Sequence, residues 1–131
     1  MQAAGYSGTP LPKKLGMKPG QRVAFVDLPA ELGELRTAEA FSQDDGPRDL
    51  VLAFHTSAAA LQATLDGLKA SIAPNGMIWI AWPKKAARTD TDITEDVVRR
   101  FALARGLVDV KVCAISEVWS GLKLVIPVKD R

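Results

Sequence analysis

The chain has 131 residues, is 47% hydrophobic and 24% charged, and carries a formal net charge of +2. This length and composition are typical of one folded domain and exclude a disordered, collagen-like or disulfide-framework chain. The net charge is too small for a dedicated nucleic-acid-binding protein, and the apolar runs are too short to span a bilayer. With Cys113 as its single cysteine and no apolar leader in its first twenty residues, the sequence predicts a cytoplasmic protein without disulfides.

The first part of the chain is rich in residues that interrupt regular structure. Seven glycines and prolines in residues 1–21 predict a loop-rich arm ahead of an α/β domain formed by residues 22–131. The mostly apolar segment 22–28 predicts the first buried strand, and Pro29 either ends it or begins a short helix. The polar residues that follow, up to 48, are typical of a surface loop.

Two further apolar runs predict buried strands, one over residues 49–55 and one over 77–82. Between them, apolar residues recur at helical spacing, so we expect a helix that Ser57 or Thr56 caps and that ends within residues 73–76. The apolar residues of this helix are Leu61, Leu65, Leu68 and Ile72.

The last third of the chain predicts one more helix and two strands. Asp92 and Glu95 resemble a capping box at the start of the helix, and Gly106 suits its C-terminal cap. Strands over 107–115 and 122–128, joined by a short connection, predict an antiparallel hairpin at the edge of a sheet. The alternating order predicts a single-domain α/β fold: a Rossmann-like three-layer sandwich with right-handed crossovers and a mostly parallel sheet of about five strands.

Two segments carry a resemblance to a known fold. Residues 15–23 combine a leucine, a proline-glycine pair and a strand, and residues 68–83 place a proline-asparagine-glycine turn before a strand. Together with the final hairpin they resemble the class I methyltransferase-type Rossmann fold. That family holds S-adenosylmethionine with a glycine-rich loop after the first strand, where this chain has Asp27-Leu28-Pro29. We therefore expect no cofactor bound in the usual way, and the segment before the second strand is too short for the two further strands of the full methyltransferase sheet.

A second resemblance covers nearly the whole chain. Its motifs are Gly5-Tyr6-Ser7-Gly8-Thr9-Pro10-Leu11, Trp82-Pro83-Lys84-Lys85, Thr91-Asp92, Gly106-Leu107-Val108-Asp109, Lys111-Val112-Cys113-Ala114 and Trp119-Ser120-Gly121-Leu122. These motifs, in this order, look like a bacterial family of small proteins that is grouped only as a domain of unknown function. The resemblance implies a fold and a bacterial, cytoplasmic setting, and it implies no activity.

The carboxyl ends of the predicted strands are the expected working surface, because ligands of open α/β sheets bind there. Polar residues follow each of the first three strands, and hydroxyl groups in the glycine-rich arm are suited to wrapping a phosphate. The candidate ligand-binding residues are Ser7, Thr9, Asp27, His55, Thr56, Trp82, Lys84 and Lys85. Should the arm fold over this edge, seven cations would surround it: Lys13, Lys14, Lys18, Arg22, Lys84, Lys85 and Arg88.

Each candidate also has a plainer explanation. His55 is the only histidine, which excludes a histidine-rich metal site and favours a hydrogen-bonded structural residue. Cys113 lies in a β-branched run and is typical of a small core residue. Lys84 and Lys85 precede several acidic residues, so solvated or paired surface charge explains them better than a ligand does. No metal site is predicted.

Three functions remain open at this point. The sequence favours a non-catalytic module that binds a small anionic ligand or a protein partner at the carboxyl edge. The first alternative is a minimal methyltransferase-like enzyme that uses S-adenosylmethionine together with Asp27, His55 and Lys84. The second is a structural protein that forms a homodimer through its last strand. Nucleic acid and membrane are not expected partners.

Overall fold

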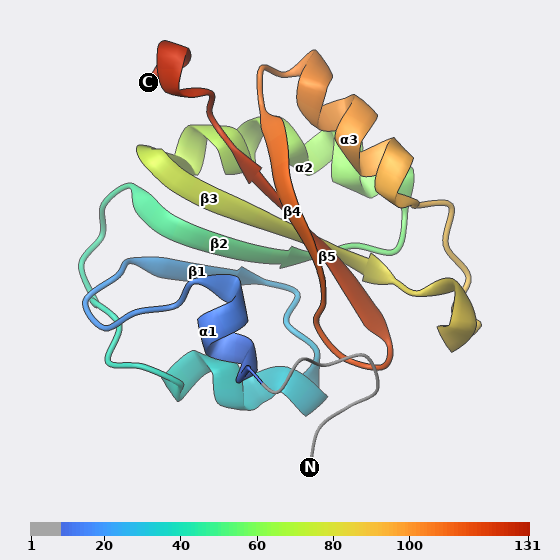
Figure 1. Cartoon of the computed structure of the whole chain (residues 1–131), viewed down its shortest axis with the longest axis horizontal. Coiled ribbons are helices and arrows are strands. Elements are labelled where there is room, and N and C mark those ends of the chain that lie inside the picture. Colours follow the sequence, from blue (N-terminus) through green and yellow to red (C-terminus); the bar gives the residue numbers. More distant parts are fainter. Residues whose placement is uncertain (1–8) are drawn as a thin grey trace.

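The computed structural model describes residues 9–131 and shows one five-stranded sheet with helices on both faces (Figure 1). The strands are β1 (Val23–Val26), β2 (Arg48–Phe54), β3 (Ile72–Pro83), β4 (Val108–Ala114) and β5 (Trp119–Val125). The helices are α1 (Leu11–Leu15), α2 (Ala58–Ser71) and α3 (Glu95–Ala104), with 3₁₀ helices η1 (Ala30–Thr37), η2 (Lys85–Ala87) and η3 (Val128–Asp130). In this part of the chain no helix has the length and apolarity needed to cross a membrane.

The sheet is mixed, which corrects the expectation of a mostly parallel one. Its strand order is β1-β2-β3-β5-β4. The β1–β2 and β2–β3 pairs are parallel, whereas β3–β5 and β4–β5 are antiparallel. The C-terminal hairpin is present as predicted, but β5 lies inside the sheet between β3 and β4. β5 therefore pairs on both of its sides, and β1 and β4 are the edge strands of the sheet.

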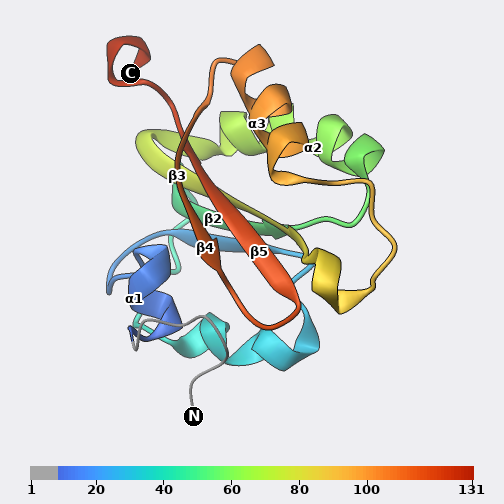
Figure 2. The same ribbon diagram turned by 45° about the vertical axis from the view of Figure 1, so that its right-hand side comes forward.

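Helices cover the two faces of the sheet with two separate cores (Figures 1 and 2). On one face, Leu61 and Leu65 of α2 pack against Ile78 and Ile80 of β3. On the other, α1 and η1 pack on a core that contains Trp79. We call these the α2 face and the α1 face. Trp79 and Trp82 lie in different cores, as expected for two residues three positions apart on one strand.

The chain before β1 contains more structure than its glycines and prolines predict. Residues 11–15 form α1, which begins beside proline and ends at Gly16 with a φ of 82°. Leu15 and Met17 are buried in the core of the α1 face. The prediction of a purely loop-rich arm over residues 1–21 is therefore wrong for this stretch, because its few apolar residues are enough to pack one helical turn.

The helix caps confirm one sequence prediction and correct another. The Ser57 hydroxyl accepts a hydrogen bond from the Ala60 N–H at 3.3 Å and caps α2, as predicted. The cap of α3, however, is Thr94, whose hydroxyl accepts from the Val97 N–H. Asp92 instead accepts from the Ala58 N–H at 2.7 Å, so it satisfies the first turn of a different helix.

The third strand is longer than predicted. It begins at Ile72, directly after α2, and includes the proline-asparagine-glycine segment that was expected to be a turn. There the chain passes close to β2: a Cβ added to Gly76 would lie 2.7 Å from the Arg48 carbonyl oxygen. Glycine is required at this position because the two backbones are in contact.

The two parallel crossovers lie on opposite faces of the sheet. The strand order advances in one direction from β1 through β2 to β3, yet η1 packs on the α1 face and α2 on the α2 face. Connections that advance in the same direction over opposite faces have opposite handedness. One of the two therefore departs from the right-handed rule that the sequence analysis applied to both.

Candidate functional site

A pocket of about 300 Å³ lies at the carboxyl ends of β1 and β2, and we call it the strand-end pocket. It is formed where these two parallel strands end beside the first turn of α2 and the start of β5. Its lining consists of Asp27, Phe54, His55, Thr56, Ser57, Ala60 and Trp119. The volume is at the lower end of the range for small-molecule sites.

Asp27 lies immediately after β1, where the chain turns toward η1. Its φ is 54°, a left-handed conformation that is uncommon for a residue other than glycine. Leu28 and Pro29 follow, and the proline φ of −59° begins the 3₁₀ helix. Aspartate tolerates this conformation better than most residues. The tight turn places Asp27 at the rim of the pocket.

His55 follows β2 directly and is 6% exposed. Its Nε2 lies 2.9 Å from the hydroxyl of Thr64, which itself donates to the Leu61 carbonyl in α2. Its Nδ1 is buried, and no atom of residues 9–131 meets it with good hydrogen-bond geometry, although the Ala53 backbone lies close enough to act on the ring. Burial lowers the pKa of His55, while the charge of Asp27 and the Ala53 backbone act in the opposite direction. The imidazole is therefore neutral at pH 7 and keeps one ring nitrogen available.

Trp119 is the first residue of β5 and closes the pocket from the other side. Its ring meets that of Phe54 edge to face, with centroids 5.0 Å apart and planes at 90°. The indole Nε1 is buried and, like His55 Nδ1, has no partner among the described residues. An unpaired buried donor costs free energy comparable to a lost hydrogen bond, so this pocket contains two polar atoms that a ligand or a water could satisfy.

The residues after His55 connect this pocket to the loop before α3. The Thr91 hydroxyl donates to the Thr56 carbonyl at 2.7 Å, and Asp92 accepts from the N–H of Ala58. These two hydrogen bonds join segments more than thirty residues apart. They fix the loop against the start of α2, and residues of this loop line a second pocket.

The second pocket, which we call the loop pocket, has a volume of about 480 Å³ and lies at the carboxyl end of β3. Trp82, Pro83 and Ile93 supply its apolar surface. Lys85 and Glu95 are the charged residues that line it, and threonines complete its rim. It is separate from the strand-end pocket, although both open at the same edge of the sheet.

The structure thus distributes the candidate residues over more than one place. Asp27, His55 and Thr56 meet in the strand-end pocket, and Trp82 and Lys85 meet in the loop pocket. Lys84 lines neither of them, and its N–H donates to the Val118 carbonyl at 2.7 Å. Thr9 lines a groove beside β4, and Ser7 lies outside the described residues. A ligand-binding role for each of them stays a prediction.

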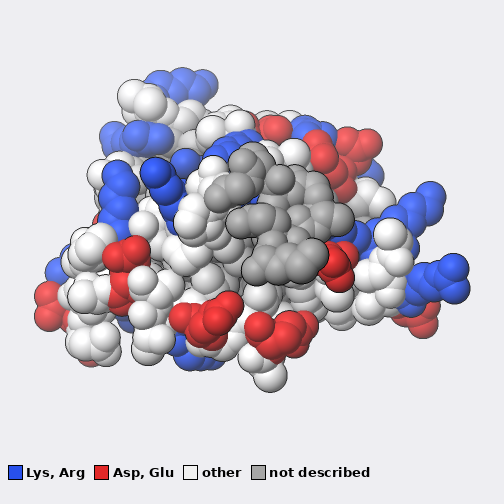
Figure 3. Space-filling model, turned by 60° about the horizontal axis from the view of Figure 1, so that its bottom comes forward, with Lys and Arg blue, Asp and Glu red and all other residues white. Residues whose placement is uncertain are grey.

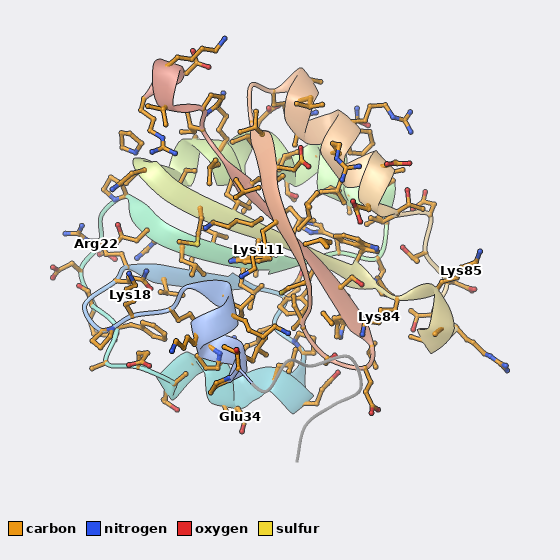
Figure 4. The ribbon with its side chains drawn as sticks, viewed as in Figure 1. Lys18, Arg22, Glu34, Lys84, Lys85 and Lys111 are labelled. Carbon is orange, nitrogen blue, oxygen red and sulfur yellow. The ribbon has the colours of Figure 1, made fainter. Side chains whose placement is uncertain are left out.

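The basic residues do not form one ring around the carboxyl edge. Lys18 and Arg22 lie at the start of β1, on the opposite side of the molecule from Lys84 and Lys85 (Figure 4). Figure 3 likewise shows lysine and arginine side chains in separate groups on the two sides of one face. The expectation of seven cations around one edge is therefore wrong, because Lys18 and Arg22 lie at the opposite end of the strands from Lys84 and Lys85.

Four lining residues of the strand-end pocket were not identified as site residues from the sequence: Phe54, Ser57, Ala60 and Trp119. Phe54 reads as an ordinary core residue of its strand, and Trp119 as part of the hairpin turn. Only the strand order, with β5 next to β3, brings Trp119 to the ends of β1 and β2. Among residues 9–131, no cluster of three or more metal-ligating side chains is present.

No protein-family model and no curated protein sequence matches the chain. The similar solved structures include several methyltransferases. An S-adenosylmethionine-dependent methyltransferase from Aquifex aeolicus has a TM-score of 0.61 and 16% identity over 87% of this chain and 86% of its own. Magnesium protoporphyrin IX methyltransferase from Synechocystis PCC 6803, with bound S-adenosylhomocysteine, has a TM-score of 0.53 and 13% identity over 82% and 74% of the two chains. The chain therefore has a methyltransferase-like Rossmann fold.

Proposed function

We propose that this protein binds a small polar ligand in the strand-end pocket. The observation that carries the proposal is the pair of buried, unpartnered nitrogens, His55 Nδ1 and Trp119 Nε1, in one pocket with the Asp27 carboxyl. Polar atoms buried in a folded protein are nearly always satisfied, so two such atoms in one cavity favour an occupant. The position agrees with the general location of ligands in open α/β sheets.

The lining residues restrict the chemistry of the occupant. Asp27 favours a donor or a positive charge, and the indole N–H of Trp119 requires an acceptor. The lysines expected to attract an anion lie outside this pocket. A ligand that carries both kinds of group, such as a zwitterion with an amino and a carboxylate group, therefore suits the pocket better than a simple anion.

The comparisons favour a second candidate function, a minimal methyltransferase-like enzyme, because the similar folds belong to S-adenosylmethionine-dependent methyltransferases. S-Adenosylmethionine carries cationic groups and acceptors, and when bound it supplies an activated methyl group. The turn after β1 does not fit the usual way of holding it: Asp27, Leu28 and Pro29 stand there, and Gly33 lies inside η1 with no atom near its missing Cβ. Asp27, His55 and Trp119 would have to replace a glycine cradle.

The experiment is a calorimetric titration of the protein with S-adenosylmethionine, S-adenosylhomocysteine and a set of free amino acids. The variant W119F removes the indole donor but keeps an aromatic ring against Phe54. The matched control W82F makes the same change in the loop pocket. We expect W119F to weaken binding about tenfold, the effect of losing one hydrogen bond to a charged group, and W82F to leave it unchanged.

The outcomes separate the two candidates. Binding of amino acids that W119F weakens, without binding of either adenosyl compound, supports a ligand-binding domain. Binding of S-adenosylmethionine with the same dependence on Trp119 supports the enzyme, and transfer of a labelled methyl group to any acceptor would establish it. If no compound binds, or if W82F and W119F weaken binding equally, the strand-end pocket is not the site.

A further inference from the structure

A groove with a volume of about 730 Å³ runs along the free edge of β4, and we call it the β4 groove. Four consecutive residues of the strand, from Lys111 to Ala114, line it, so the groove follows the strand edge. Lys13 and Lys14 of α1 form its opposite wall, and Ser120 of β5 also lines it. Three lysines from two segments distant in sequence therefore surround one groove that lies outside the strand-end pocket.

Hydrogen bonds hold two of these lysines in place. Lys14 Nζ donates to the Ala114 carbonyl at 3.1 Å, which covers part of the β4 edge. Lys111 Nζ donates to the Lys14 carbonyl at 3.3 Å. Figure 4 shows Lys111 near the centre of the view. The ammonium groups of Lys14 and Lys111 are thus directed toward the contact between α1 and β4.

Lys13 and Lys111 form no ion pair with an acidic side chain among residues 9–131. Lys111 lies directly opposite Lys123 in the β4–β5 ladder, and like charges in this arrangement destabilise a sheet. The acidic lining residue, Glu95, forms an ion pair with Arg99. Every ion pair given by the described side chains uses an arginine, namely Arg22, Arg99 or Arg105. An unfavourable lysine pair beside further lysines is explained if an anion lies among them.

Cys113 reports the electrostatic potential in the groove. It is half-buried on the floor, and burial raises the pKa of its thiol. The charges of Lys14, Lys111 and Lys84 all act in the opposite direction and favour the thiolate. Three cations from three separate segments therefore stabilise a negative charge at the same point of the groove.

We propose that the β4 groove is a second binding site, and that it takes an anion of the phosphate type with two or more negative charges. Lysine ammonium groups supply the charge and are the donors that oligophosphates accept. Lysine on an edge strand also discourages edge-to-edge pairing. That role explains Lys111 alone, but it explains neither Lys13 nor the facing Lys123.

The test uses Cys113, the only cysteine of the chain, as its readout. The rate of its alkylation by uncharged N-ethylmaleimide is measured at low ionic strength with increasing inorganic pyrophosphate, and separately with a nucleoside diphosphate. A bound anion covers the thiol and raises its pKa, so we expect alkylation to slow and the half-point to move to higher concentration as salt is added. Equal protection by both compounds shows that the phosphates are recognised alone, and stronger protection by the nucleotide shows additional contacts.

Two variants with the same change in net charge make the test specific. K13Q/K111Q removes two cations from the groove, and K18Q/K85Q removes two from elsewhere on the molecule (Figure 4). We expect the groove variant to raise the half-point about tenfold and the control to leave it nearly unchanged. The four substituted lysines are all exposed. The single variant K111Q repeats the test with a smaller change in net charge. No protection of the wild-type protein, or the same loss in both double variants, overturns the proposal.

Discussion

At the scale of single residues, His55 shows how burial changes the chemistry of a side chain. It is buried between β2 and α2, bonds to Thr64 through one nitrogen and keeps the other free in the strand-end pocket. Because burial is the largest influence, the pKa of His55 in the folded protein lies below its ordinary value of 6.5. The folded protein thus contains a neutral imidazole that resists protonation.

This lowered pKa predicts how stability depends on pH. As pH falls below about 6.5, the unfolded chain binds a proton at His55 before the folded chain does, so the free energy of unfolding decreases. The contribution is fully present above pH 6.5 and is lost as pH falls through the folded-state pKa. Urea unfolding between about pH 7.5 and about pH 5 measures it, since most carboxylates titrate lower, near pH 4.

The variant H55N is the control for this prediction. No other histidine is present, so the variant should lose most of the slope of unfolding free energy against pH in this interval. An unchanged slope in H55N would show that another group controls the acid sensitivity.

Gly76 provides a second prediction at this scale. In G76A the new methyl group would meet the backbone oxygens of Arg48 at 2.7 Å and Ala73 at 3.0 Å, neither of which can move independently. We expect unfolding free energy to fall by about 1–3 kcal/mol, as in overpacked sites. In G33A the methyl group meets nothing within 4 Å, so stability should change by less than about 0.5 kcal/mol or rise slightly. Similar losses in the two variants would contradict the close approach.

The candidate site could be predicted from the sequence only in part, and single residues show why. Asp27, His55 and Thr56 follow neighbouring parallel strands, and the carboxyl ends of such strands meet at one edge of the sheet. Trp119 and Lys111 belong to a hairpin whose place in the sheet does not follow from local pattern. The residues that share a pocket with Trp119 or a groove with Lys111 could therefore be identified only from the structure.

At the scale of secondary-structure elements, the loop before α3 stabilises α2 from a distance. Asp92 accepts from the first N–H of α2, and Thr91 bonds to the turn that precedes this helix. A carboxylate at a helix N-terminus also interacts favourably with the helix dipole. The loop is thus fixed to the start of α2 by polar contacts.

The prediction at this scale is that D92A destabilises the protein by about 1 kcal/mol, the usual cost of losing a helix cap. D90A removes the same charge two residues earlier, where no hydrogen bond to a helix is formed, and should have little effect. Thermal unfolding of the two variants at equal ionic strength measures the difference. Equal midpoints would mean that the Asp92 contact contributes nothing measurable to α2.

Elements with strong local signals were predicted well and those that depend on packing were not. The apolar stripe of α2 and its Ser57 cap confirm the predicted helix. The pair Asp92 and Glu95 predicted helix α3 correctly but named the wrong N-cap residue. Threonine is also a favoured helix cap, and Asp92 accepts its hydrogen bond from α2 instead. Helix α1 was missed because its stability comes from burying Leu15 and not from its own five residues.

At the scale of the whole molecule, the sheet order determines which parts open first. β2, β3 and β5 pair on both sides, whereas β1 and β4 pair on one side only. β1 is also the shortest strand, with four residues. We expect hydrogen exchange to be slowest in β2 and β3 and faster in β1 and β4, because edge strands open without breaking a second ladder. Mass spectrometry of exchanged peptides measures this order, and equal protection of β1 and β2 would contradict it.

The fold class could be predicted because it depends on the alternation of strands and helices along the chain. The mixed character of the sheet could not, because the hairpin residues 108–125 are compatible with either an edge position or an inserted one. The same insertion removes the last strand as a surface for a homodimer. A pairing between copies would have to use β1 or β4, and β4 carries Lys111 and an irregularity in its register.

The insertion of β5 also has a consequence for synthesis on the ribosome. β5 is the last strand in chain order but pairs with β3, which is made much earlier. Until Val125 has left the exit tunnel, β3 presents a long unpaired edge of apolar residues to solvent, and β4 has no partner in the sheet. The nascent chain therefore passes through a stage in which three of its five strands can pair while the edge of β3 stays open, and chaperone binding to β3 would be of most use then.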